Sequence, residues 1–128
     1  MPDWCAQHAR PEHLCCQSTI EAEFRAIRCY VCQTILDAGA NCGAASVYFA
    51  HHYPDAEIHA CEPAGPQRTV LERNAATRPS ITVHPVGLHA EDGELPIYQG
   101  LTDSGMTSLI PGEWNAGEPT ETVTVRAA

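Results

Sequence analysis

Lysine is absent from the sequence, and cationic side chains are scarce. Seven arginines stand against 16 acidic residues, which gives the 128-residue chain a formal net charge of −9. Proteins that bind nucleic acids or anionic membranes in a general way need a cationic surface. We therefore expect neither a nucleic acid nor a membrane as a partner, and we interpret the acidic balance as a feature that favours solubility.

Long apolar runs are also missing. No run approaches the roughly 20 apolar residues that span a bilayer. The stretch MPDWCAQHARPEHLCC at the N-terminus is polar and contains no hydrophobic signal region. We expect a cytoplasmic protein whose seven cysteines remain thiols, because an odd number fits a complete disulfide framework poorly.

The sequence does contain an alternation of strand and helix patterns. Residues 1–17 show no clear period, whereas the capping pair Ser18 and Glu21 predicts the start of a helix over about residues 19–29. The segments that follow are predicted to be a strand (31–37), a helix (44–53), a strand (56–62), a helix (65–77) and a strand (80–88). This order is typical of an α/β fold with a mostly parallel sheet and right-handed crossovers. In the helix over 65–77, Val70 and Leu71 are expected to face inward.

The pattern changes after residue 89. A turn at Glu91-Asp92-Gly93 precedes a short predicted strand over 95–99, and residues 122–128 alternate like another strand. Between them lies a long segment, 101–121, that is rich in glycine, serine, threonine and proline. A loop of this length is usually functional or disordered.

The stretch ILDAGANCG, residues 35–43, predicts a binding turn at the end of a buried strand. Ligands of parallel sheets bind at the carboxyl ends of the strands, where glycine lets the backbone approach them closely. Glu62 ends the next strand, and an acid at that place can accept hydrogen bonds from ribose hydroxyls. The turn lacks the second glycine of a dinucleotide fingerprint, and Asp37 would repel a pyrophosphate while attracting an amino group or a sulfonium. These features favour S-adenosylmethionine over NAD as the cofactor.

Three segments resemble the FkbM-type S-adenosylmethionine-dependent methyltransferases. They are ILDAGANCGAASVYFAHHYPDAEIHACEP, VHPVGLHAEDGELPIY and DSGMTSL, and together they place the resemblance over about residues 33–126. The resemblance implies a class I methyltransferase fold, which is Rossmann-like. It also implies a cofactor-binding domain over 18–128, preceded by an irregular segment over 1–17.

The same resemblance implies a set of residues that bind the cofactor. Those of the turn would hold its amino-acid end: Asp37, Gly39, Ala40, Asn41 and Gly43.

Glu62, followed by Pro63, would bind the ribose, and Leu88 beside Gly87 would line the adenine.

A later acidic segment of the family, which helps to close the pocket, has no counterpart in these 128 residues. We therefore expect a partial domain that is truncated at the C-terminus. A catalytic base is not identified.

Other candidate ligands have simpler interpretations. Cys29 and Cys32 have metal-ligand spacing, and Cys5 with His8 could supply a second pair for zinc. The spacing is irregular, so we expect thiols and no metal site. His84 and His89 flank the end of a strand. One of them could reach the cofactor or a substrate proton, although a structural role is the more common one for a histidine.

Two functions of different classes follow from these features. The first is a methyltransferase that acts on a hydroxyl of a small molecule or a sugar, with no metal required. The second is a non-catalytic half-domain that binds S-adenosylmethionine weakly or needs a partner chain to complete its sheet. Asp103 and Ser104 could contact a substrate, although turn formation is their more ordinary role.

Overall fold

The computed structural model describes residues 33–100, 107–113, 115 and 118–127. All of these residues belong to the second of two compact units, which spans Gln33–Ala128. Several features of the sequence lie outside the described residues: the helix expected over 19–29, the N-terminal cysteines up to Cys32, and Asp103 with Ser104.

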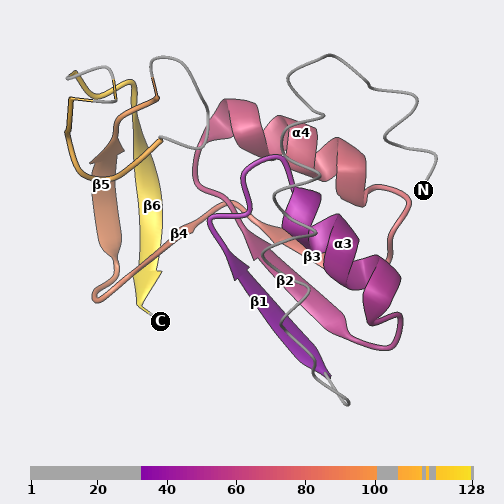
Figure 1. Ribbon diagram of the computed structural model, residues 1–128. Helices are drawn as coiled ribbons and strands as arrows, with labels where there is room; N and C mark the ends of the chain where they lie inside the picture. The colour runs from indigo at the N-terminus through magenta and orange to yellow at the C-terminus, as the bar shows by residue number, and fades with distance from the viewer. Residues whose placement is uncertain (1–32, 101–106, 114, 116–117, 128) are drawn as a thin grey trace. The chain divides into compact units, whose positions relative to one another are not determined.

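The first part of this unit is a three-stranded parallel sheet with two helices (Figure 1). Its elements are β1 (Thr34–Ala38), α3 (Ala44–His52), β2 (Glu57–Cys61), α4 (Gly65–Ala75) and β3 (Ile81–His84). The sheet order is β1-β2-β3, and both pairs of neighbours are parallel. The alternating α/β order expected from the sequence is therefore confirmed. Among the described residues, no helix is long and apolar enough to cross a membrane.

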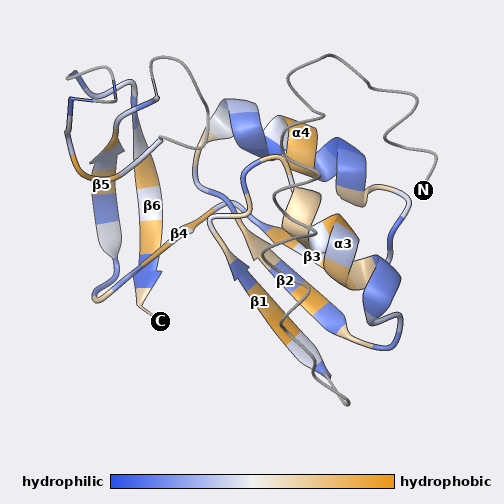
Figure 2. Cartoon of the chain, in the orientation of Figure 1, coloured by the Kyte–Doolittle hydropathy of each residue, from blue (hydrophilic) through white to orange (hydrophobic). Residues whose placement is uncertain are grey.

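Side chains alternate between two environments along the strands of this sheet. Ile58 and Ala60 of β2 have no exposed surface, while His59 between them is half-buried. In β1, Leu36 pairs in register with His59 and is 58% exposed. The hydropathy pattern of β2 in Figure 2 follows the same alternation. Since successive side chains of a strand point to opposite faces, the core of this sheet lies on the face to which Ile58 and Ala60 belong.

Helix α4 presents one fully buried side chain to the rest of the unit. Leu71 has no exposed surface, as expected. The expectation for Val70 was wrong, because its side chain is 36% exposed. Adjacent positions of a helix differ by about 100° around its axis, so a helix that buries a narrow stripe cannot bury both.

The strand expected over residues 80–88 is two strands that belong to different sheets. Strand β3 ends at His84, and β4 (Gly87–His89) pairs with another strand, β6 (Glu121–Ala127). Pro85 lies at the break. Proline has no N–H to donate to a strand ladder, so the pairing of the first sheet stops there.

The second sheet has the order β4-β6-β5, where β5 is Gly93–Ile97. Strand β6 runs parallel to β4 and antiparallel to β5. The expectation of a mostly parallel sheet therefore holds for the first sheet and not for the second.

The second sheet contacts the start of α4. Ile97 and Val123 form a buried cluster with Ala64, the residue before the helix. The backbone N–H of Gly65 donates a 3.1 Å hydrogen bond to the Glu121 carboxylate. A carboxylate at a helix N-terminus satisfies a free N–H and interacts favourably with the helix dipole. Glu121 therefore stabilises the first turn of α4 from a strand 56 residues away along the chain.

Gly43, in the turn after β1, lies against Leu71 of α4. A β-carbon at this position would lie 2.5 Å from Leu71 Cδ1, and its φ is +83°. Gly39 has a similar φ of +76° but no atom within 4 Å of the position that a β-carbon would take. At Gly43 a side chain is disfavoured both by the positive φ and by a clash with Leu71. At Gly39 it is disfavoured by the positive φ alone.

We expect Gly43→Ala to destabilise the protein by about 2–4 kcal/mol, because backbone strain and overpacking against Leu71 add together. Gly39→Ala, the matched control, should cost about 1 kcal/mol, because only the strain applies. Urea unfolding of both variants measures the difference. Equal losses would show that Leu71 yields without cost.

Candidate functional site

The turn after β1 is fixed to the end of β2 by its backbone. The N–H groups of Gly39 and Ala40 both donate to the carbonyl oxygen of Cys61, each at 2.9 Å. Asn41 has a left-handed φ of +50°, between the two left-handed glycines. Asparagine tolerates this conformation better than most residues, which explains its presence where a third glycine would serve.

Glu62 joins this turn to the segment that starts α4. Its side chain is only 6% exposed. One carboxylate oxygen accepts a 2.8 Å hydrogen bond from the N–H of Asn41, and the other accepts a 2.8 Å bond from the N–H of Ala64. Burial raises the pKa of Glu62, while the hydrogen bonds from Ala64 and Asn41 and the charge of Arg68 oppose that rise.

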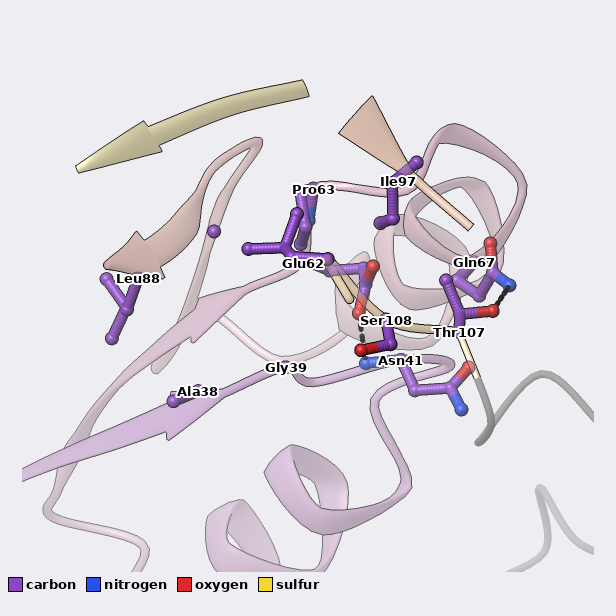
Figure 3. Close-up of a pocket in the computed structure, with 12 residues that line it drawn as sticks. Ala38, Gly39, Asn41, Glu62, Pro63, Gln67, Leu88, Ile97, Thr107 and Ser108 are labelled. Carbon is purple, nitrogen blue, oxygen red and sulfur yellow. Dashed lines mark hydrogen bonds between the residues drawn. The ribbon is translucent and has the colours of Figure 1, made fainter. Parts of the chain in front are cut away.

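A pocket of about 330 Å³ opens beside Glu62 (Figure 3). This size lies within the range of small-molecule sites. The described residues that line it come from the β1 turn, the end of β2, α4, β4, β5 and the segment 107–109, and they are Ala38, Gly39, Asn41, Glu62, Pro63, Gln67, Gly87, Leu88, Ile97, Thr107, Ser108 and Leu109. The pocket therefore lies at the carboxyl ends of the parallel strands, where α/β proteins bind ligands.

The charge of the pocket wall is negative. Among the described lining residues, Glu62 is the one ionisable side chain, and none is basic. A wall with a carboxylate and no cation suits a ligand that offers hydrogen-bond donors or a positive charge. It does not suit a pyrophosphate, which needs cations or several free N–H groups.

The segment over 107–109 forms one wall of the pocket. Tyr98 and Ser108 exchange two backbone hydrogen bonds of 2.8 and 2.9 Å. Leu109 packs against the buried cluster that contains Ala64 and Ile97. These contacts fix the wall to β5 and to the start of α4.

Asp37 lies next to the pocket without lining it. The hydroxyl of Ser46 donates to its carboxylate at 2.5 Å. Burial raises the pKa of Asp37, and hydrogen bonds from the Ser46 hydroxyl and backbone oppose the rise. The pKa of the Cys61 thiol is raised as well, first by burial and then by the charge of Asp37. Asp37 therefore places a poorly solvated negative charge behind the turn.

The structure places some of the sequence-predicted site residues in the pocket wall and others behind it. Five line the pocket: Gly39, Asn41, Glu62, Pro63 and Leu88. Three do not: Asp37, Ala40 and Gly43.

Ala40 and Gly43 are instead buried within the turn.

The wall also contains residues that the sequence did not single out as ligand contacts. They include Gln67, Ile97 and Thr107. The motif DSGMTSL was a signal for the segment that carries Thr107. Gln67 had no signal, because a polar residue in the first turn of a helix is ordinary.

A zinc site was the alternative that the sequence suggested for some of the cysteines and histidines. In the described part of the chain, no group of three or more histidine, cysteine, aspartate or glutamate residues is placed to hold a metal ion. His84 bonds to His59, with 3.0 Å between the ring nitrogens His84 Nε2 and His59 Nδ1. The zinc hypothesis for Cys29 and Cys32 is not tested, because both lie outside the described residues.

Comparison with known proteins gives one informative match. The chain is 38% identical over 84 residues to Methyltransferase sdnD of Sordaria araneosa. The match covers 63% of this chain and 32% of the relative, so the chain spans about a third of the relative's length. No family model matches the chain, and no solved structure matches it. The pocket thus belongs to a mixed α/β protein that is similar, over part of its length, to a protein named a methyltransferase.

Replacement of Asp37 tests the charge behind the turn through the pH dependence of stability. Because burial raises the folded-state pKa of Asp37 above 3.8, the folded chain holds the proton more tightly than the unfolded chain. The contribution of Asp37 to stability therefore falls as pH rises from about 4 through the raised pKa. We expect Asp37→Asn to flatten the decline in unfolding free energy over this window, as measured by urea unfolding at several pH values.

Ser46→Ala is the opposing variant. It removes a hydrogen bond that lowers the pKa of Asp37, so the decline with pH should become steeper than in the wild type. A slope that neither variant changes would mean that Asp37 is as well solvated in the folded chain as in the unfolded one.

Proposed function

We propose that this chain is the cofactor-binding part of an S-adenosylmethionine-dependent methyltransferase of the FkbM type, with a class I, Rossmann-like architecture. The order β1-α3-β2-α4-β3 with parallel pairing supports the architecture. The partial similarity to a protein named a methyltransferase supports the reaction class. We further propose that the protein is cytoplasmic.

The observation that carries the proposal is the fixed carboxylate of Glu62 beside a pocket with no described basic residue. Each oxygen of an ionised carboxylate can accept about two hydrogen bonds. Each oxygen of Glu62 already accepts one hydrogen bond from a backbone N–H, so each can accept one further hydrogen bond from a ligand. Two acceptors on neighbouring oxygens match the two hydroxyls of a ribose.

Other residues take roles that fit their positions. Gly39 and Asn41 would hold the amino-acid end of the cofactor with the backbone of the turn. The negative charge of Asp37, one layer behind, would favour the ammonium and sulfonium groups of S-adenosylmethionine. Pro63 and Leu88 would supply apolar contacts for the adenine. The cofactor, when bound, supplies an activated methyl group.

The proposed reaction is transfer of that methyl group to the hydroxyl of a small molecule or a sugar. The sulfonium is already a good leaving group, so the protein contributes mainly by holding the two reactants in line. A general base would assist a hydroxyl acceptor. The described residues around the pocket serve the cofactor side, and we assign none of them as the base.

A second candidate is a non-catalytic half-domain that binds the cofactor weakly or requires a partner chain. One observation favours it. In the described part of the chain, β1 pairs on one side with β2, and its Leu36 is 58% exposed. An edge strand of this kind offers hydrogen-bonding groups and apolar surface to another strand.

Titration calorimetry of S-adenosylmethionine, with NAD as the comparison ligand, tests the proposed cofactor. We expect saturable binding of S-adenosylmethionine and none of NAD. Glu62→Gln should weaken binding by at least about tenfold, or 1.4 kcal/mol, because the amide offers one acceptor in place of two. Glu91→Gln, an exposed acid outside the pocket, should bind as the wild type does.

Binding of NAD, or equal binding by Glu62→Gln and the wild type, would contradict the proposed cofactor. The two candidate functions separate in a methyl-transfer assay with sugar and small-molecule hydroxyl acceptors. Binding without transfer to any acceptor favours the half-domain.

A further inference from the structure

Gln67 presents an unusual polar group at the pocket. It lies in the first turn of α4 and lines the pocket. Its amide nitrogen donates a 3.3 Å hydrogen bond to the hydroxyl of Thr107. Its carbonyl oxygen, Oε1, is buried and has no hydrogen-bond partner among the described residues. Buried carbonyl oxygens are nearly always paired in folded proteins, so an orphan in a pocket wall indicates a donor on the ligand.

The orientation of the Gln67 side chain is fixed by its neighbour. The hydroxyl oxygen of Thr107 also accepts a 3.3 Å hydrogen bond from the N–H of Gly100. The next residue, Ser108, is held by its two backbone bonds to Tyr98. Thr107 is held by the bond from Gly100 and by the bonds of its neighbour Ser108. The amide nitrogen of Gln67 is therefore occupied by its hydrogen bond to Thr107 (Figure 3). The carbonyl oxygen is the atom that remains for a ligand.

The donors of an adenosyl group divide naturally among the acceptors of this pocket. They are the two ribose hydroxyls and the exocyclic amino group of the base. Glu62 has one open acceptor position on each oxygen, which suits the two hydroxyls. The hydroxyl oxygen of Ser108 accepts from the N–H of Ile110, and that of Thr107 accepts twice. Gln67 Oε1, which bonds to no described residue, can accept a hydrogen bond from the amino group.

We propose that Gln67 is the residue that selects adenine, by accepting a hydrogen bond from the exocyclic amino group at its Oε1. The inference rests on the proposed function and names a specificity determinant within the same site. A hypoxanthine base carries an oxygen in place of that amino group. Two acceptors would then face each other in a buried place, which is unfavourable because neither finds a donor.

Calorimetry with two ligands that differ in this one group tests the inference. The probes are S-adenosylhomocysteine and S-inosylhomocysteine. We expect the wild type to bind the adenine ligand at least about tenfold more tightly. Gln67→Met, which has similar length and no acceptor, should reduce this ratio to near one, whereas Gln67→Glu should keep it.

Two further variants test whether the affinity ratio depends on the orientation of Gln67 and on its place in the pocket. Thr107→Val leaves Gln67 in place but removes the hydroxyl that orients it, so the ratio should fall towards that of Gln67→Met. Gln99→Met, a glutamine outside the described pocket lining, should keep the wild-type ratio. Urea unfolding of each variant establishes that the ratio is measured on folded protein.

The outcomes are distinct. An unchanged ratio in Gln67→Met overturns the inference, and so does equal weakening of both ligands, which indicates a structural role alone. A wild type that binds neither ligand overturns the proposed function itself. A wild type that binds both with equal affinity leaves the cofactor assignment standing and removes Gln67 as the determinant.

Discussion

The carboxylate of Glu62 is the interaction on which the rest of the site depends. It accepts one backbone N–H from the turn after β1 and one from the segment before α4. These two segments are separate connections of the α/β unit, and the side chain holds both at the carboxyl end of β2. Charge-assisted hydrogen bonds of this kind are stronger than neutral ones, which offsets part of the cost of burying a charge. The same group that organises the turn also faces the pocket.

The site carries two acids in poorly solvated positions, Glu62 in the pocket wall and Asp37 behind the turn. Burial raises the pKa of both Asp37 and Glu62, so each is less stable as a charged group in the folded chain than in water. A positively charged or donor-rich ligand would relieve this penalty when it binds. Destabilised polar groups that persist in a fold are typical of functional sites. Two side chains, Asp37 and Glu62, therefore carry a free-energy cost in folding that a bound ligand would reduce.

The sequence was sufficient to predict the elements whose patterns are local. The alternation of strands and helices over residues 34–75, the glycine turn and the placement of Glu62 all follow from short-range rules. The break at Pro85 could also have been read from proline chemistry, but the apolar letters on both sides of it suggested one strand. The error at Val70 has a different origin, because propensity does not say which of two adjacent apolar residues faces the core.

The remaining parts of the site depend on contacts between distant segments. Nothing near Gln67 in the sequence indicates Thr107, which lies 40 residues further on. The wall over 107–109 is held in position because Leu109 packs against a cluster formed by the residue before α4 and by β5 and β6. Such pairings are decided by tertiary packing, which a single sequence does not display.

The hydrogen bond between Gly65 and Glu121 has a consequence for the time course of folding. Residues that start α4 are synthesised early, yet two of their partners, Glu121 and Val123, come from β6. Contacts between residues so far apart along the chain are slow to form, because a long loop must close before they are gained. On the ribosome, the parallel sheet can begin to assemble while the pocket wall is still incomplete. The binding site is thus expected to be among the last regions of the unit to reach its final form.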